Sequence, residues 1–156
     1  MKKILVFLSG MLLFFGVLGV ANATLWDRGG GLLYDDVLDI TWLQNANYAA
    51  SEVNETRAQE IIDAVGSIDD HILTLADFHD YDYAGGSYNG KMSWYGSLAW
   101  ADQFVYGGYD DWRLPKGGNQ IGGGELGHMY YENLPLYSSL IYNLVENYYW
   151  STYVIA

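Results

Sequence analysis

The sequence predicts an α+β fold in which short helices accompany irregular antiparallel strands. Residues 25–43 alternate short apolar runs with Gly and Asp breaks, which is typical of strands joined by tight turns. Residues 56–65 and 93–105 instead carry apolar residues at helical spacing. The nineteen Gly residues indicate a chain with many turns.

The first twenty-three residues have the pattern of a secretory signal peptide. Lys2 and Lys3 precede an apolar run over residues 4–20, which ends at the small-x-small site Ala21-Asn22-Ala23. This run is too short and too interrupted by Ser and Gly for a stable membrane span, which needs about 20 apolar residues. We therefore expect cleavage after Ala23 and a secreted or periplasmic chain with one domain over residues 24–156.

Charge and composition exclude some partners. Without Lys2 and Lys3, five basic residues face nineteen acidic ones, a formal net charge of −14. Such a chain repels phosphate backbones and anionic lipid, so nucleic acid is not an expected partner. The acidity fits divalent cations, cationic partners or neutral glycans, or a merely solubilising surface. Fifteen Tyr and six Trp suit either half-buried sheets or sugar-binding faces.

The first predicted element after the signal is a set of short strands. Gly29-Gly30-Gly31 and Asp35-Asp36 mark two turns. The runs between and beside these turns predict strands near Leu25-Trp26, at Leu32-Leu33-Tyr34 and at Ile40-Thr41-Trp42-Leu43.

A helix is predicted to open at Thr56, because Gln59 stands in capping-box position three residues later. Its core stripe is Ala58, Ile61, Ile62 and Val65, and Gly66 is expected to end it. Ser67 with Asp70 predicts the cap of a further short helix.

A central helix is predicted from the N-cap Ser93. Its expected core stripe is Trp94, Leu98, Ala101 and Val105. Trp100 lies outside the stripe, so it either meets a second layer or stays exposed as a contact residue, and we expect a loop to bury it. Gly107-Gly108 is expected to form the left-handed C-terminal turn. Residues 112–115 should then run extended into Pro115, before a short helix that carries Glu125, Leu126, Met129 and Tyr130.

Two segments resemble a known family. The string GGYDDWRLP over residues 107–115, followed by Glu125 in ELGHMYYEN, is similar to the core of the Lcl C-terminal domain-like family. The segment WDRGGGLLYDDVLDITWLQNAN resembles the opening of the same family, with Trp42 as the matching structural aromatic. This family of secreted bacterial proteins, long called a domain of unknown function, is related in fold to formylglycine-generating enzymes and C-type lectins. The resemblance therefore implies a C-type-lectin-like or formylglycine-generating-enzyme-like domain.

The end of the chain departs from the family pattern. NYYWSTYVIA resembles the Tyr-Trp-Ser-Ser-Thr strand of the family, which further strands follow in relatives, whereas this chain stops at Ala156. We therefore expect a sheet that is incomplete at the C-terminus. The apolar strand from Tyr148 to Ile155 then offers an edge for association with another chain.

The candidate ligand site is the acidic loop Tyr109-Asp110-Asp111-Trp112. Carboxylates suit hard cations such as calcium, and aromatic rings suit a stacked sugar, so both ligand types stay open beside a simple solvated turn. Arg113 is expected to bridge the carboxylate of Glu125 or Asp111 and so fix the loop, with ligand binding as its alternative role.

Enzyme chemistry finds little support. The formylglycine-generating activity depends on cysteine thiols, and this chain has no Cys. His71, His79 and His128 stand in no nucleophile or zinc pattern, although His128 could pair with Glu132 or supply one metal ligand. Asp80 and Asp82 give residues 79–91 only a partial likeness to a calcium loop, so a metal site is left open and no other cofactor is expected.

Two functional classes follow. The first is a non-enzymatic extracytoplasmic module for ligand binding or adhesion, with a glycan or another surface ligand as partner. The second is a structural or vestigial truncated fragment without a ligand of its own. Exposed aromatic rings beside the acidic loop would separate them, because ligand binding needs such rings and scaffolding does not.

Overall fold

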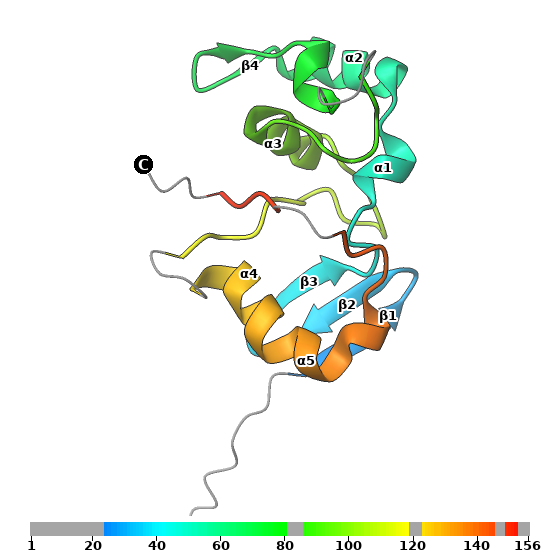
Figure 1. Ribbon diagram of the computed structural model, residues 1–156, viewed down its shortest axis with the longest axis vertical. Coiled ribbons are helices and arrows are strands. Elements are labelled where there is room, and N and C mark those ends of the chain that lie inside the picture. Colours follow the sequence, from blue (N-terminus) through cyan, green and yellow to red (C-terminus); the bar gives the residue numbers. More distant parts are fainter. Residues whose placement is uncertain (1–23, 81–85, 119–122, 146–148, 153–156) are drawn as a thin grey trace, which may run out of the picture.

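The computed structural model describes residues 24–80, 86–118, 123–145 and 149–152. It shows a small α+β protein with a three-stranded antiparallel sheet and several short helices (Figure 1). None of the helices in these ranges is long and apolar enough to cross a membrane. The predicted signal peptide lies outside the described residues. The coarse α+β prediction is confirmed, whereas the lectin-like assignment stays a prediction.

The sheet follows the predicted strands closely. It consists of β1 (Leu25–Gly29), β2 (Leu32–Asp35) and β3 (Ile40–Leu43), in the order β1-β2-β3. Trp26 lies opposite Tyr34, and Tyr34 lies opposite Thr41, so these three side chains share one face. We call this face of the sheet the outer face.

Asp35 closes the turn between β2 and β3. Its Oδ1 accepts the backbone N–H groups of Val37 and Leu38 at 3.1 and 3.0 Å. An Asp side chain that bonds the backbone two or three residues later mimics a backbone turn. The predicted Asp turn is therefore confirmed, with a carboxylate that is fully buried.

The next elements are α1 (Ala49–Glu52) and α2 (Glu55–Val65). The N-cap of α2 is Asn54, whose side chain accepts the N–H of Arg57 at 3.0 Å. The predicted cap at Thr56 is thus wrong by two residues, because the Asn amide satisfies the free N–H first. The predicted end at Gly66 is confirmed, with a positive φ of 76°.

A β-hairpin replaces the helix that Ser67 and Asp70 were predicted to cap. Its strands are β4 (Ser67–Ile68) and β5 (His71–Ile72). Asp69 and Asp70 connect them at φ values of 47° and 66°. Two consecutive positive φ values form the turn that matches strand twist, and Asp tolerates this region better than most residues.

The central helix begins as predicted but ends early. After η1 (Leu75–Phe78), α3 spans Trp94–Asp102, and Ser93 caps it by accepting the N–H of Gly96 at 3.0 Å. Val105 lies beyond the helix and is 68% exposed, so the predicted stripe is wrong at this position. The buried positions of α3 are Gly96, Ser97, Ala99 and Ala101, of which Ala101 alone belongs to the predicted stripe.

Two contacts account for the early end of α3. Arg57 donates from Nη2 to the carbonyl of Gln103 at 2.8 Å, which satisfies one of the last free carbonyls. The next residue, Phe104, turns its ring into the interior and is 3% exposed. Trp100 is half-buried against Phe104, with ring centroids 4.7 Å apart, and donates its indole N–H to Glu52.

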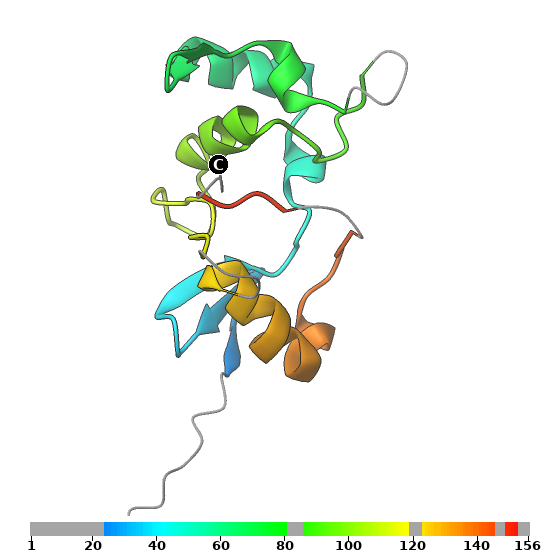
Figure 2. The ribbon, with the colours of Figure 1, turned by 60° about the vertical axis from the view of Figure 1, so that its left-hand side comes forward.

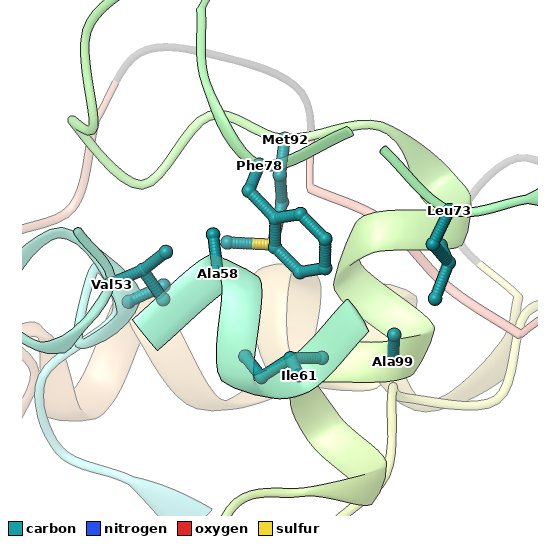
Figure 3. Close-up of a cluster of buried hydrophobic side chains, with 8 residues drawn as sticks. Val53, Ala58, Ile61, Leu73, Phe78, Met92 and Ala99 are labelled. Carbon is teal, nitrogen blue, oxygen red and sulfur yellow. The ribbon is translucent and has the colours of Figure 1, made fainter. Parts of the chain in front are cut away.

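One apolar core joins α1, α2, η1 and α3 (Figure 3). In Figure 3, Phe78 and Met92 lie over α2, which turns Ala58 and Ile61 toward the centre. The buried residues of this core are Ala49, Val53, Ala58, Ile61, Leu73, Phe78, Met92 and Ala99.

A helical segment covers the inner face of the sheet (Figures 1 and 2). The predicted helix around Glu125 is confirmed as α4 (Gly124–His128), which continues into the π-helix η2 (Met129–Asn133), α5 (Leu134–Tyr137) and η3 (Ser138–Leu140). Met129 packs against Leu25 and Leu33 in a second core, and Trp42 lies at its edge as a structural aromatic.

The last described residues lie between α3 and the extended segment at Pro115 and bond to both (Figure 1). Thr152 donates its N–H to the carbonyl of Pro115 at 2.9 Å, and Trp94 donates its indole N–H to the carbonyl of Ser151 at 2.8 Å. The prediction of a C-terminal strand from Tyr148 to Ile155 is wrong for residues 149–152, which form no strand, and the remainder lies outside the described residues.

Candidate functional site

The candidate loop begins in a tight turn. Tyr106 and Tyr109 exchange both backbone hydrogen bonds at 3.0 Å, around Gly107 and Gly108 with φ values of 62° and 85°. This pairing defines a two-residue hairpin turn, so the prediction that the glycines end the central helix is wrong. The turn faces β2, because a Cβ on Gly107 would come within 2.7 Å of Cδ1 of Leu32.

Tyr106 fixes this turn to the sheet. Its hydroxyl donates to the carbonyl of Gly30 at 2.8 Å, across 76 residues of sequence. Its ring stacks on Phe104 with a centroid distance of 5.8 Å and contacts Tyr48 at 4.9 Å. The turn that carries Tyr109 is therefore held on a rigid aromatic base.

The four predicted ligand residues differ in exposure. Tyr109 is 42% exposed, and its ring meets Trp112 edge-on at 6.4 Å. Trp112 is half-buried, and its Nε1 donates to the carbonyl of Tyr106 at 3.3 Å. Asp110 and Asp111 are both exposed. The loop thus offers one accessible ring beside two carboxylates, with Trp112 as its support.

A wide, open concavity of about 570 Å³ adjoins Tyr109. We call it the Gly-rich concavity, because the turn between β1 and β2 forms one wall and the Gly107 turn forms the other. Residues far apart in the sequence therefore meet at this place. The lining residues are Arg28, Gly29, Gly30, Leu32, Gly107 and Tyr109.

Among the described residues that line the Gly-rich concavity, Arg28 alone has a charged side chain. Its guanidinium lies 4.3 Å from the ring centroid of Tyr34, and its Nη1 donates to Oγ1 of Thr41 at 3.0 Å. A guanidinium has five N–H donors in a fixed fork. Tyr34 and Thr41 therefore orient a donor-rich group at the rim of the concavity.

The predicted pairing of Arg113 with Glu125 is present. The two side chains form a bidentate ion pair, with Nη1 to Oε2 at 2.7 Å and Nη2 to Oε1 at 2.8 Å. Glu125 also accepts the backbone N–H of Lys116 at 2.7 Å. Asp111 has no part in this pair. The contacts join the extended segment to the start of α4, as expected for a structural role.

The charge of Glu125 depends on these contacts. Burial by itself raises the pKa of Glu125, but the hydrogen bonds from Arg113 and Lys116 outweigh it and hold the pKa below the ordinary 4.5. The hydrogen bond to Glu125 in turn raises the pKa of Arg113. Both partners are therefore charged at neutral pH.

Two of the histidines face carboxylates. Nε2 of His128 lies 3.5 Å from Oδ2 of Asp35 rather than beside Glu132, the partner that the sequence left possible. His71 lies 3.0 Å from Oδ1 of Asp77, a carboxylate that also accepts the hydroxyl of Ser93 at 2.6 Å. Because Ser93 donates to this carboxylate, the three groups do not form a nucleophilic triad.

The described ranges contain no group of three or more His, Asp or Glu residues placed to hold a metal ion. In the segment 79–91, with its partial likeness to a calcium loop, Asp80 pairs with Lys91 at 2.8 Å and accepts a hydrogen bond from Nδ2 of Asn89 at 3.2 Å. Asp82 lies outside the described residues. Calcium therefore stays an open expectation.

No protein-family model matches the chain, and neither a search of curated proteins nor a search of solved structures gives a significant match. The geometry of the Gly-rich concavity and its aromatic rim is therefore the basis for a functional proposal. Sequence reasoning found Tyr109 but missed Arg28. The signal for Arg28 was its position beside the Gly29-Gly30-Gly31 turn.

Proposed function

We propose that this protein is a non-enzymatic extracytoplasmic binding module for a glycan, with the ligand seated against Tyr109 in the Gly-rich concavity. The observation that supports it is the meeting of an exposed aromatic ring and an oriented guanidinium at one open concavity. Small-ligand sites combine apolar or aromatic walls with a few fixed polar groups. A sugar ring, with one apolar face and a rim of hydroxyls, fits this combination.

The two carboxylates of the loop extend the polar part of the proposed site. Asp110 and Asp111 directly follow Tyr109 and are exposed, so they can accept hydroxyl hydrogens of a sugar or ligate a calcium ion. The ring of Tyr109 has little freedom, because Trp112 supports it and Tyr106 anchors the turn. A site that is ordered before binding loses less entropy when the ligand arrives.

The second candidate function is a scaffold without a ligand. Its support is Trp112, which is half-buried and packs on Phe104 with a centroid distance of 5.7 Å. If Tyr109 only shields Trp112 from solvent, the acidic loop is a solvated turn. The two functions then differ in what the loss of the Tyr109 ring changes: ligand affinity in one case and thermal stability in the other.

A glycan array with and without calcium tests the proposal. The wild-type protein should bind at least one glycan on the array. The variants Tyr109→Ala and Asp110→Ala/Asp111→Ala should not bind that glycan, although their melting temperatures should equal that of the wild type. Tyr131→Ala is the matched control, because Tyr131 is 53% exposed on η2 and outside the concavity. If all variants bound the glycan as well as the wild type does, the site would lie elsewhere. If the wild type bound no glycan on the array, the scaffold function would be favoured.

A further inference from the structure

We propose that the binding surface extends from the Gly-rich concavity across the outer face of the sheet, and that its ligand is a neutral oligosaccharide of several rings. This inference rests on the proposed glycan function and names the class of glycan. The observation that supports it is a row of side chains, Arg28, Tyr34 and Trp26, that lie on one face of the sheet next to the concavity that Tyr109 lines.

The row starts inside the concavity. Tyr109 and Arg28 line the same space from opposite walls. The guanidinium of Arg28 then lies 4.3 Å from the ring centroid of Tyr34 on β2. Tyr34 in turn lies directly opposite Trp26 on β1. Opposed residues on one face of an antiparallel pair have Cβ atoms about 5 Å apart, so Tyr34 and Trp26 occupy adjacent positions on this face.

The far end of the row is open to solvent. Trp26 is 57% exposed, although Trp is among the side chains that gain most from burial. The helical segment covers the inner face of the sheet, and in Figure 2 no described helix lies over the outer face. An oriented and exposed Trp on such a face is a suitable platform for a flat apolar ligand surface.

Polar groups along the row are fixed at the edges of the rings. Nε1 of Trp26 donates to Oδ2 of Asp36 at 3.3 Å, and the hydroxyl of Tyr34 donates to Oδ1 of Asp39 at 2.8 Å. The hydrogen bond to Asp39 raises the pKa of Tyr34, which favours the protonated hydroxyl that makes this bond. Each carboxylate keeps acceptor capacity for a ligand hydroxyl.

Charge selects a neutral chain over an anionic one. Asp36 and Asp39 flank the row, since they accept hydrogen bonds from Trp26 and Tyr34, and the whole sequence has a formal net charge of −12. The single cation in the row, Arg28, already lies against the Tyr34 ring and hydrogen bonds to Thr41. A polyanionic chain would meet this surface with net repulsion, whereas hydroxyl groups find acceptors along it.

Length dependence of binding tests this inference. The probes are disaccharides and hexasaccharides of β-1,4-linked glucose, of α-1,4-linked glucose and of β-1,4-linked N-acetylglucosamine, measured by calorimetry. Polygalacturonate serves as the anionic polymer. In at least one neutral series the wild type should bind the hexasaccharide roughly tenfold more tightly than the disaccharide, as one added stacked ring allows. Polygalacturonate should not bind.

Variants of Trp26 test whether this residue is the source of the higher affinity for the hexasaccharide. Trp26→Ala should lower the affinity for the hexasaccharide to that for the disaccharide, and Trp26→Phe should retain most of the gain because it keeps a ring. Tyr109→Ala should lose both ligands, whereas Tyr131→Ala should lose neither. Equal binding of both lengths, or an unchanged length dependence in Trp26→Ala, would overturn the extended surface but leave glycan binding intact. Preferential binding of polygalacturonate would overturn the neutral class. No binding of any neutral probe would reject the glycan function itself.

Discussion

Asn133 donates its side-chain amide to Oδ2 of Asp35 at 2.7 Å, and both residues are fully buried. This bond joins the π-helix η2 to the middle strand of the sheet. Asp35 thereby receives three hydrogen bonds, two from the turn that follows β2 and one from the helical segment. The inner face of the sheet and its cover are therefore tied by a polar contact as well as by the apolar core.

Replacing Asn133 with Ala should destabilise the protein strongly. The change removes a bond to a buried carboxylate, which costs about 2–3 kcal/mol when the partner stays buried. Urea unfolding of the two proteins measures the difference. Glu132→Ala is the matched control, because Glu132 is the exposed neighbour on the same segment and should cost under about 0.5 kcal/mol. Equal midpoints for both variants would contradict the role of Asn133.

Replacing Arg113 with Ala should have a moderate effect. The Arg113 side chain is 41% exposed and that of Glu125 is 12% exposed, so the pair lies between a surface pair and a buried one. We expect the free energy of unfolding to fall by about 1–2 kcal/mol, which is less than the 3–5 kcal/mol that breaking a fully buried pair costs. Arg113→Lys should recover only part of it, because Lys cannot form the bidentate contact. Thermal melts that show full recovery in Arg113→Lys would contradict this geometry.

Asp77 should make stability depend on acid pH. Burial raises its pKa, but hydrogen bonds from Ser93, Thr74 and His71 outweigh burial and lower it below 3.8. A lowered folded-state pKa contributes stability above the unfolded pKa, and that contribution is lost as the pH falls through the folded value. Melting temperatures should therefore fall steeply below about pH 4. Asp77→Asn should melt lower at neutral pH and show a shallower acid slope; an identical slope would exclude Asp77 as the source.

The sequence predicted the elements whose signals are local. The three strands, the cap at Ser93 and the helix at Glu125 depend on neighbouring residues, and all are present. The Arg113–Glu125 pair was also predictable, since both charges flank one short Gly-rich connection. Turns and helix caps of this kind depend on a few neighbouring residues, so they can be predicted from the sequence alone.

The errors at the end of the central helix and at the concavity arise from contacts between residues far apart in the sequence. The central helix was expected to continue to Val105, but Arg57 on α2 satisfies the carbonyl of Gln103 and lets the chain turn there. Gly107-Gly108 suits a helix end and a hairpin turn equally well, because both need positive φ. The Gly-rich concavity was not predicted as a whole, since Arg28 and Tyr109 meet only after folding.

The exported form should begin at Thr24. The expectation follows from the small-x-small site Ala21-Asn22-Ala23 after an apolar run. Intact-mass measurement on protein from the extracytoplasmic fraction decides the start point. Recovery of a chain that still begins at Met1 in the inner membrane would contradict export as a cleaved protein.

The most direct test of glycan binding at the Gly-rich concavity is an amide NMR titration of the protein with the tightest-binding neutral hexasaccharide. The backbone amides of Gly29, Gly30 and Gly107 belong to the lining, and the indole N–H of Trp26 reports on the outer face. The account predicts that these four signals shift together and saturably, while the amides of Tyr130 and Tyr131 stay fixed. Shifts that cluster on the helical segment 124–137, with the three glycine signals unchanged, would contradict it.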